Sequence, residues 1–174
     1  MKLSVVIPFY NEENMIQKMY DELVKEINQI TKAEFEIIFI NDGSKDRTFE
    51  RMLAIAAGDS RVKYISFSRN FGKEAGTIAG LEYATGEAVI LMDGDLQHPP
   101  AMLPKMIEAY EQGYDVVSAR RTRTGEKRHR TFLAKHFYKL ANKMMDIELM
   151  DGVSEFRLFS RKVVNAIISM QEYN

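Results

Sequence analysis

The feature that most constrains the fold of this chain is a regular alternation of short apolar runs with segments of helical periodicity. The apolar runs predict buried strands and span residues 3–7, 35–40, 62–67, 88–92 and 115–118. The segments between them, at residues 15–30, 49–56, 75–83 and 102–110, carry apolar residues at helical spacing. Strands joined through helices pair in parallel with right-handed crossovers. The alternation therefore predicts an α/β, Rossmann-like fold with a doubly wound, mainly parallel sheet and helices on both faces.

Length and composition narrow the class of protein. The 174 residues suffice for one domain with a substantial core, so we expect a single domain over residues 1–174. The net charge of −1 gives no reason to expect nucleic acid as a partner. The absence of cysteine excludes disulfides and thiolate metal sites. No apolar stretch approaches the roughly 18 residues of a membrane-spanning helix, so the chain itself is expected to be soluble.

The region after the fifth apolar run has a different character. Between Arg120 and Lys143 there are nine basic residues (120, 121, 123, 127, 128, 130, 135, 139 and 143) and one acidic residue, Glu126. A helix expected near 133–144 has an apolar stripe beside these basic residues, which is typical of a helix on an anionic membrane and also of an ordinary surface helix. A short strand at 156–160 and a helix at 161–169 are expected after it.

Two carboxylates, Asp93 and Asp95, stand on either side of Gly94 directly after the run that ends at Met92. Open α/β sheets bind ligands at the carboxyl ends of their strands. Closely placed carboxylates repel each other unless a cation lies between them, and Mg²⁺ or Mn²⁺ prefers such oxygen ligands. The motif indicates a divalent ion that bridges to a phosphate, although Asp-Gly is also ordinary turn chemistry.

Polar side chains also follow the first two strands. Pro8, Tyr10 and Glu12 offer a ring for stacking and a carboxylate for hydroxyl or ring N–H groups, and Asn11 is expected to cap the next helix. After the second strand, Gly43 favours a tight turn, and Ser44 or Asp46 is expected to cap the following helix. Asp42 is expected to have no role in that turn and to accept a hydrogen bond from a nucleobase or ribose.

Four segments together resemble the family 2 inverting glycosyltransferases with the GT-A fold, and most nearly the polyprenyl-phosphate sugar transferases such as dolichyl-phosphate mannose synthase and the bactoprenol glucosyltransferases. These segments are residues 6–12, 41–44, 93–100 and 156–158. They occur in order over essentially the whole chain, and no one of them would be specific alone. The resemblance implies a nucleotide sugar (a UDP- or GDP-hexose) as donor, a polyprenyl phosphate as acceptor, and Mg²⁺ or Mn²⁺ as cofactor.

The resemblance also implies roles for individual residues. Pro8, Tyr10, Glu12 and Asp42 would hold the nucleoside; Asp93 would bind the ribose or sugar and, with Asp95 and Gln97, the metal; Arg120, Arg130 and Lys135 would bind the donor diphosphate and acceptor phosphate. Asp95, Arg120 and Glu155 would form the catalytic group. The chain departs from the usual pattern at Asn41, Ala134 and Glu155, where the family more often has Asp, Ser and Asp. Glu155 puts the usual base in doubt because its side chain is one methylene longer.

The acceptor decides whether Glu155 is needed as a base. A phosphate monoester, with a second pKa near ~6, is already mostly a dianion at neutral pH, whereas a sugar hydroxyl must lose a proton to attack. With a lipid phosphate we expect Glu155 to orient groups or to pair with Arg157, and with a hydroxyl acceptor we expect it to act as the base. His98 is expected to pack or to support a metal ligand rather than to bind the metal.

Alternative functions remain at this point. Transfer to a sugar hydroxyl in cell-surface polysaccharide synthesis and a non-catalytic nucleotide-sugar binding domain are both compatible with the motifs. A dinucleotide oxidoreductase is disfavoured because no Gly-x-Gly-x-x-Gly turn follows Ile7, Ile40 or Met92. Members of the family usually continue into a juxtamembrane or transmembrane region. The resemblance therefore implies a longer protein that works at the cytoplasmic face of a membrane, and attachment mostly through residues beyond 174.

Overall fold

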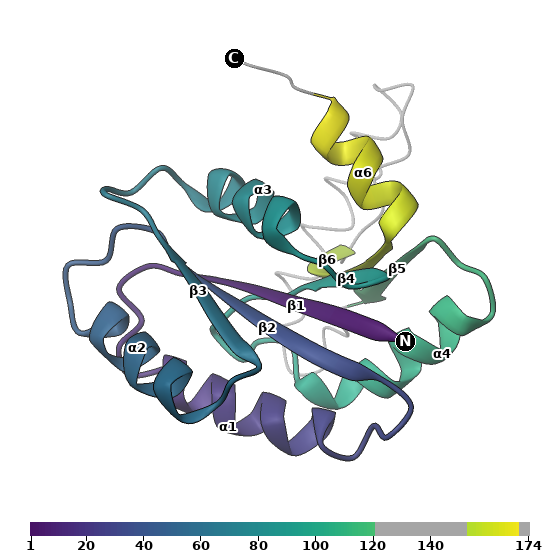
Figure 1. Cartoon of the computed structure of the whole chain (residues 1–174), viewed down its shortest axis with the longest axis horizontal. Helices are drawn as coiled ribbons and strands as arrows, with labels where there is room; N and C mark the ends of the chain where they lie inside the picture. Colours follow the sequence, from purple (N-terminus) through teal and green to yellow (C-terminus); the bar gives the residue numbers. More distant parts are fainter. Residues whose placement is uncertain (121–152, 171–174) are drawn as a thin grey trace, which may run out of the picture.

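The computed structural model describes residues 1–120 and 153–170, and within them the strands form one mixed sheet (Figure 1). The strands are β1 (Lys2–Phe9), β2 (Glu34–Asn41), β3 (Val62–Ser66), β4 (Ala88–Leu91), β5 (Val116–Arg120) and β6 (Val153–Ser160). Their order is β3-β2-β1-β4-β6-β5. The first four strands pair in parallel, whereas β6 runs antiparallel to both β4 and β5. The predicted α/β fold class is confirmed, with antiparallel pairing at the β5 end of the sheet.

Helices cover both faces of this sheet, as predicted. They are α1 (Ile16–Ile27), α2 (Thr48–Gly58), α3 (Lys73–Tyr83), α4 (Leu103–Glu111), which follows a 3₁₀ turn at Pro100–Met102, and α6 (Arg161–Ser169). Figure 1 shows α1, α2 and α4 on one face and α3 and α6 on the other. Buried side chains divide in the same way into two clusters, one beneath each group of helices.

The central strands have continuous apolar sequences because both of their faces are covered. In β1, Val5 and Ile7 belong to the cluster under α1 and α4, whereas Val6 between them belongs to the cluster under α3 and α6. All three side chains are fully buried. Successive side chains point to opposite faces of a strand, so a strand buried on both faces shows no polar alternation.

The structure corrects the expected start of the first helix. α1 begins at Ile16, and no side chain caps it at Met15. Asn11 instead adopts φ +54°, a left-handed conformation that asparagine tolerates better than most residues. The prediction that Asn11 caps this helix is therefore wrong.

β6 begins three residues before the strand expected at 156–160, and its first residue, Val153, pairs with Arg120 of β5. Its antiparallel direction brings its first residues to the edge at which the parallel strands end, where Arg157 lies opposite Leu91 of β4. The segments that follow β1, β2 and β4 meet at that same edge. None of the helices in residues 1–120 and 153–170 combines the length and apolar character that a membrane crossing requires.

Candidate active site

A pocket of about 320 Å³ opens where the parallel strands end. Six of the residues predicted to bind the donor or the metal line it: Pro8, Tyr10, Glu12, Asp42, Asp93 and Asp95. They come from three segments that are far apart in the sequence, the ends of β1, β2 and β4. We refer to this cavity as the nucleotide pocket. The structure thus brings together the predicted site residues that follow the ends of β1, β2 and β4.

The segments after β1 and β2 are joined by hydrogen bonds, which hold Tyr10 and Glu12 at the pocket. Asn11 N donates to Ser44 Oγ at 3.0 Å, and Asn11 Oδ1 accepts from Lys45 N at 2.8 Å. Glu12 N donates to Thr48 Oγ1 at 2.8 Å. Tyr10 remains 43% exposed, so its ring is accessible for stacking on a ligand.

Asp46 also links the segments after β1 and β2. Its carboxylate accepts from Thr48 N at 3.0 Å at the start of α2 and from Glu13 N at 3.1 Å. Burial acts to raise the pKa of Asp46, but the hydrogen bonds from Thr48 and Glu13 outweigh it and lower the pKa. Asp46 rather than Ser44 therefore supports the beginning of α2, because the Ser44 hydroxyl accepts from Asn11.

Asp42 has a structural role that the sequence analysis did not anticipate. It is only 3% exposed, and its two carboxylate oxygens accept from Phe71 N at 2.7 Å and Gly72 N at 3.0 Å. Gly72 has φ +94° and directly precedes α3. Asp42 thus holds the segment that begins α3 against the end of β2. It still lines the nucleotide pocket, so a ligand contact is compatible with this role.

The acidic motif is shaped by close packing and by an unusual turn. A Cβ atom on Gly94 would lie 2.3 Å from Cε1 of the buried Phe9 ring, so glycine is required there. Leu96 has φ +57°, which is uncommon for a branched residue, and Asp95 Oδ1 accepts from Gln97 N at 2.9 Å across this turn. Such backbone strain is often found at functional sites.

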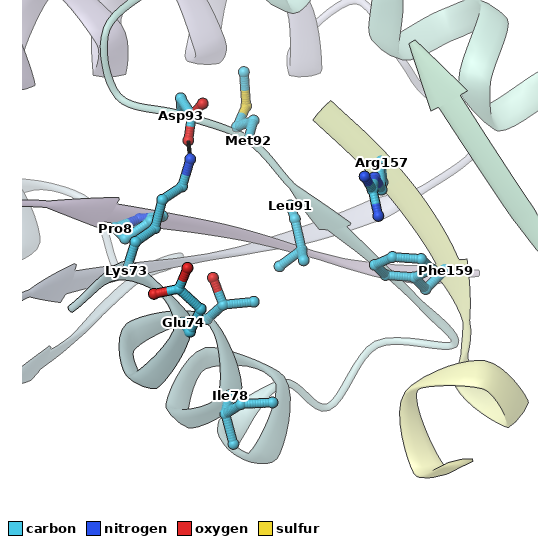
Figure 2. Close-up of a pocket in the computed structure, with 10 residues that line it drawn as sticks. Pro8, Lys73, Glu74, Ile78, Leu91, Met92, Asp93, Arg157 and Phe159 are labelled. Atoms are coloured by element: carbon cyan, nitrogen blue, oxygen red, sulfur yellow. Dashed lines mark ion pairs between the residues drawn. The ribbon is translucent and has the colours of Figure 1, made fainter. Parts of the chain in front are cut away.

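Lys73 is a pocket residue that the sequence analysis missed. It is the first residue of α3, and its Nζ lies 2.5 Å from Asp93 Oδ1 (Figure 2). Its neighbours Asn70 and Gly72 also line the nucleotide pocket. The run Arg69-Asn70-Phe71-Gly72-Lys73 follows the apolar run 62–67 and leads into α3. Its place after a strand end, together with its polar and glycine content, is the signal that could have marked it.

Two further cavities share lining residues with the nucleotide pocket. One, of about 490 Å³, shares Tyr10 and Asn70 with it and extends along the loop after β3. The other, of about 290 Å³, shares Pro8, Lys73 and Asp93 with it and lies between α3 and strands β4 and β6 (Figure 2).

The residues present suit a divalent ion of the Mg²⁺ type. Asp93 and Asp95 offer hard oxygen ligands within one pocket, and one oxygen of Asp93 pairs with Lys73. The described residues contain no group of three or more His, Asp or Glu side chains that could hold a metal. Mg²⁺ is commonly bound by one or two protein carboxylates and completed by substrate phosphates and water, so two carboxylates are compatible with it.

The other predicted site residues do not line the nucleotide pocket or are only partly described by the structure. Gln97 is exposed beside Asp95, and the His98 ring centroid lies 6.2 Å from that of Phe156. Arg120 ends β5 and Glu155 belongs to β6, but their side chains fall outside the described part of the structure. Arg130 and Lys135 lie outside the described residues altogether.

Comparison with known proteins gives a consistent assignment. Residues 4–168 match the family described as Glycosyl transferase family 2. CsbB of Bacillus subtilis (strain 168), provisionally named as a glycosyltransferase, is 49% identical over 172 residues, which are 99% of this chain and 52% of that protein. The bactoprenol glucosyl transferase of Shigella phage SfX is 44% identical over an alignment of 175 positions, which covers 100% of this chain and 57% of that protein. The chain thus spans about half the length of these relatives.

A solved structure supports the fold. The mannosyltransferase PcManGT from Pyrobaculum calidifontis, in complex with GDP-Man and Mn²⁺, has a TM-score of 0.66 at 21% sequence identity. The match covers 95% of this chain and 46% of that chain. At this identity the likeness concerns the arrangement of helices and strands alone.

Proposed function

Because this chain belongs to glycosyl transferase family 2 and has the GT-A fold, we propose that its protein transfers a hexose from a nucleoside diphosphate sugar to a polyprenyl phosphate. The reaction is a single displacement with inversion at the sugar C1 atom, assisted by a divalent ion. The acceptor phosphate oxygen forms the new bond to C1 while the bond from C1 to the diphosphate oxygen breaks. The nucleoside diphosphate leaves with the electron pair.

One observation is the main support for the proposed binding of the nucleotide sugar donor. Six residues selected from the sequence for donor or metal binding line a single pocket where the strands end. Tyr10 contributes an exposed ring to that pocket, and Asp93 and Asp95 contribute carboxylates. The nucleoside is assigned to Tyr10, and the diphosphate to the carboxylates. Ligand binding at the carboxyl ends of parallel strands is the general rule for open α/β sheets.

The metal belongs with the diphosphate. Asp93, Asp95 and Gln97 would hold Mg²⁺ or Mn²⁺, and the bound ion would act as a Lewis acid toward the departing diphosphate. The mannosyltransferase from Pyrobaculum calidifontis is in complex with GDP-Man and Mn²⁺, which supports the use of a divalent ion. Arg120, at the end of β5, is proposed to assist at the same phosphates. The Asp95–Gln97 hydrogen bond holds the carboxylate in a fixed orientation at the pocket.

The acceptor is proposed from the bactoprenol glucosyl transferase among the relatives and from the basic residues 120–143. A phosphate acceptor already carries its negative charge at neutral pH, so it needs no base to remove a proton. Glu155, with Arg130 and Lys135, is then proposed to position the acceptor. We further propose that the whole protein works at the cytoplasmic face of a membrane, where its lipid acceptor is found.

A donor screen with the whole protein tests this function. UDP-glucose, UDP-galactose, UDP-N-acetylglucosamine and GDP-mannose are each incubated with a short polyprenyl phosphate, with Mn²⁺ or with EDTA. We expect one donor to give a polyprenyl-phosphate hexose of inverted anomeric configuration, measured by NMR, and EDTA to abolish the product. Transfer only to a sugar hydroxyl would overturn the acceptor, and binding of a donor without transfer to either acceptor would indicate a binding domain.

Asp95→Asn tests the metal in the same assay. The amide keeps an oxygen that can accept from Gln97 N, so the turn is preserved while the charge is lost. We expect turnover to fall by at least about a hundredfold, as expected when charge stabilisation of a leaving group is removed. The unfolding free energy should change by less than about 1 kcal/mol. Near-normal turnover in Asp95→Asn would refute the assignment of the metal to this carboxylate.

A further inference from the structure

We propose that the cavity between α3 and the strands β4 and β6 receives the hexose of the donor, and that Glu74 and Thr77 select which hexose is bound. This inference rests on the proposed function and extends it to the identity of the sugar. We call the cavity the α3 pocket. It is lined by residues of α3, of β6 and of the end of β4, together with Pro8 of β1.

The position of the α3 pocket follows from the covalent order of a sugar nucleotide. The hexose is attached to the diphosphate, so it must occupy space that adjoins the phosphate end of the nucleotide pocket. The α3 pocket adjoins that end, because Asp93 and Lys73 line both cavities, as does Pro8 at the end of β1. The other neighbouring cavity shares Tyr10 and Asn70 with the nucleotide pocket and is lined by neither Asp93 nor Asp95. The junction at Asp93 is therefore where the C1–O bond of the donor would lie.

The chemistry of the lining fits a neutral polyol better than a second phosphate. Among the described residues that line it, Lys73 and Arg157 contribute two positive charges, and Glu74 and Asp93 contribute two negative charges, so these charges balance. A phosphate dianion would meet two carboxylates here as well as two cations. Hydroxyl groups can both donate to carboxylates and accept from cationic side chains, so a hexose can form hydrogen bonds with both kinds of charged group.

An apolar surface completes the cavity. Ile78, Leu91 and Phe159 line it beside the charged groups. Ligand pockets typically combine such a mainly apolar lining with a few polar groups that fix orientation. A hexose ring has C–H faces as well as hydroxyl edges, and this lining offers a partner to each. The volume of about 290 Å³ is close to the lower end of the range of about 300–1,000 Å³ for small-ligand pockets.

Glu74 and Thr77 are suited to discriminate between hexoses. They are three residues apart on α3, so they lie on one face of the helix, and both line the pocket. Figure 2 shows Glu74 and Lys73 extending from α3 toward β4. The start of α3 is fixed by the two hydrogen bonds to Asp42, which makes its first turns a rigid support. Hydroxyl epimers differ only in where a hydrogen-bonding group points, so fixed partners can distinguish them.

The test compares the binding of a sugar nucleotide with that of its nucleoside diphosphate. Calorimetry of the whole protein with Mn²⁺ uses UDP-glucose against UDP, and GDP-mannose against GDP. For the pair that binds, we expect Glu74→Gln and Thr77→Val each to weaken the sugar nucleotide about tenfold, the scale of one lost hydrogen bond. Both variants should bind the nucleoside diphosphate within about twofold of the unaltered protein.

Two control variants come from the same helix. Thr77→Ser keeps the hydroxyl group that Thr77→Val removes, so it should bind the sugar nucleotide nearly normally. Glu82→Gln removes an exposed carboxylate of α3 that is not among the residues of the α3 pocket, and it should change neither affinity. The transfer assay should show changed ratios between UDP-glucose and UDP-galactose for Glu74→Gln and Thr77→Val only.

The possible failures are distinguishable. If the sugar nucleotide and the nucleoside diphosphate are weakened equally, the α3 pocket holds the nucleotide and the inference is wrong. If neither affinity nor donor preference changes while hexose transfer to polyprenyl phosphate proceeds, the hexose lies elsewhere and only this inference fails. If polyprenyl phosphate binding alone is weakened, the pocket holds the acceptor. If no nucleotide binds at all, the proposed function fails and this inference fails with it.

Discussion

Lys73 Nζ lies 2.5 Å from Asp93 Oδ1, so the first residue of α3 is joined by an ion pair to a carboxylate of the acidic motif. The pair is partly exposed, at 42% for the Lys73 side chain and 27% for Asp93. A divalent ion that approaches Asp93 meets the positive charge of Lys73. We therefore predict that Lys73→Met tightens Mn²⁺ binding without nucleotide by about three- to tenfold.

Calorimetry or Mn²⁺ electron paramagnetic resonance at low salt measures this change. The gain should shrink as salt is added, because salt screens exposed charges. Lys18→Met, which removes an exposed lysine of α1, is the matched control and should leave Mn²⁺ affinity unchanged. Weaker Mn²⁺ binding in Lys73→Met would contradict the competition between the two cations.

The same ion pair shows where inference from sequence was sufficient and where it was not. Tyr10, Asp42 and Asp93 each follow an apolar run, and parallel strands end at one edge, so their meeting could be predicted. Lys73 begins the helix that leads from the edge strand β3 to β4, and its contact with Asp93 is made in a sheet in which β4 lies beside β1 rather than beside β3. The alternation of strands and helices does not specify that order. Strand order is decided by packing across the whole sheet.

Asp42 illustrates a second limit. Its position at a strand end was predicted, but its partners are backbone N–H groups 29 and 30 residues further along the chain. A side chain that binds a distant backbone segment leaves no periodic or local pattern in the sequence. The need for glycine at position 94 could likewise not be predicted from the sequence, because only the structure places Gly94 against the Phe9 ring.

Asp42→Asn is predicted to destabilise the fold by roughly 1–3 kcal/mol. The amide oxygen can accept from only one side, and the amide NH₂ group would then face a backbone N–H donor of Phe71 or Gly72. Urea unfolding measures the loss, and nucleoside diphosphate binding should weaken as well because Gly72 lines the nucleotide pocket. Asp21→Asn, on the exposed surface of α1, should cost less than about 0.5 kcal/mol. An unchanged unfolding free energy in Asp42→Asn would show that its two hydrogen bonds are not required.

Glu36 is predicted to make stability depend on pH. It is 3% exposed; burial acts to raise its pKa, but hydrogen bonds from Lys63, Ser4 and Thr85 prevail and lower the pKa to about 2. The unfolded-state pKa is about 4.3, so the ionised group contributes stability above that pH and loses it as the pH falls toward 2. The contribution is up to about 3 kcal/mol at neutral pH and about half of that at pH 3.

Urea unfolding of the unaltered protein and of Glu36→Gln at pH 6 and pH 3 measures this contribution. The difference in unfolding free energy between the two proteins should be larger at pH 6 and should shrink at pH 3. Glu34→Gln, which alters an exposed residue of the same strand, should change the unfolding free energy by less than about 0.5 kcal/mol at pH 6. A difference for Glu36→Gln that is the same at both pH values would rule out the linkage.

Gly94→Ala is predicted to cost about 1–3 kcal/mol of unfolding free energy and to weaken Mn²⁺-dependent nucleotide binding. The added Cβ would lie 2.3 Å from Phe9 Cε1, and Phe9 is 2% exposed and packs edge-on against Phe39 with ring centroids 5.3 Å apart. Because that ring has little room to move, the strain should displace the carboxylates on either side of Gly94. Gly58→Ala is the control, since nothing lies within 4 Å of its added Cβ, and it should be neutral or stabilising by up to about 1 kcal/mol. In a Phe9→Leu background Gly94→Ala should cost less, and equal costs in both backgrounds would show that the ring contact is not the cause.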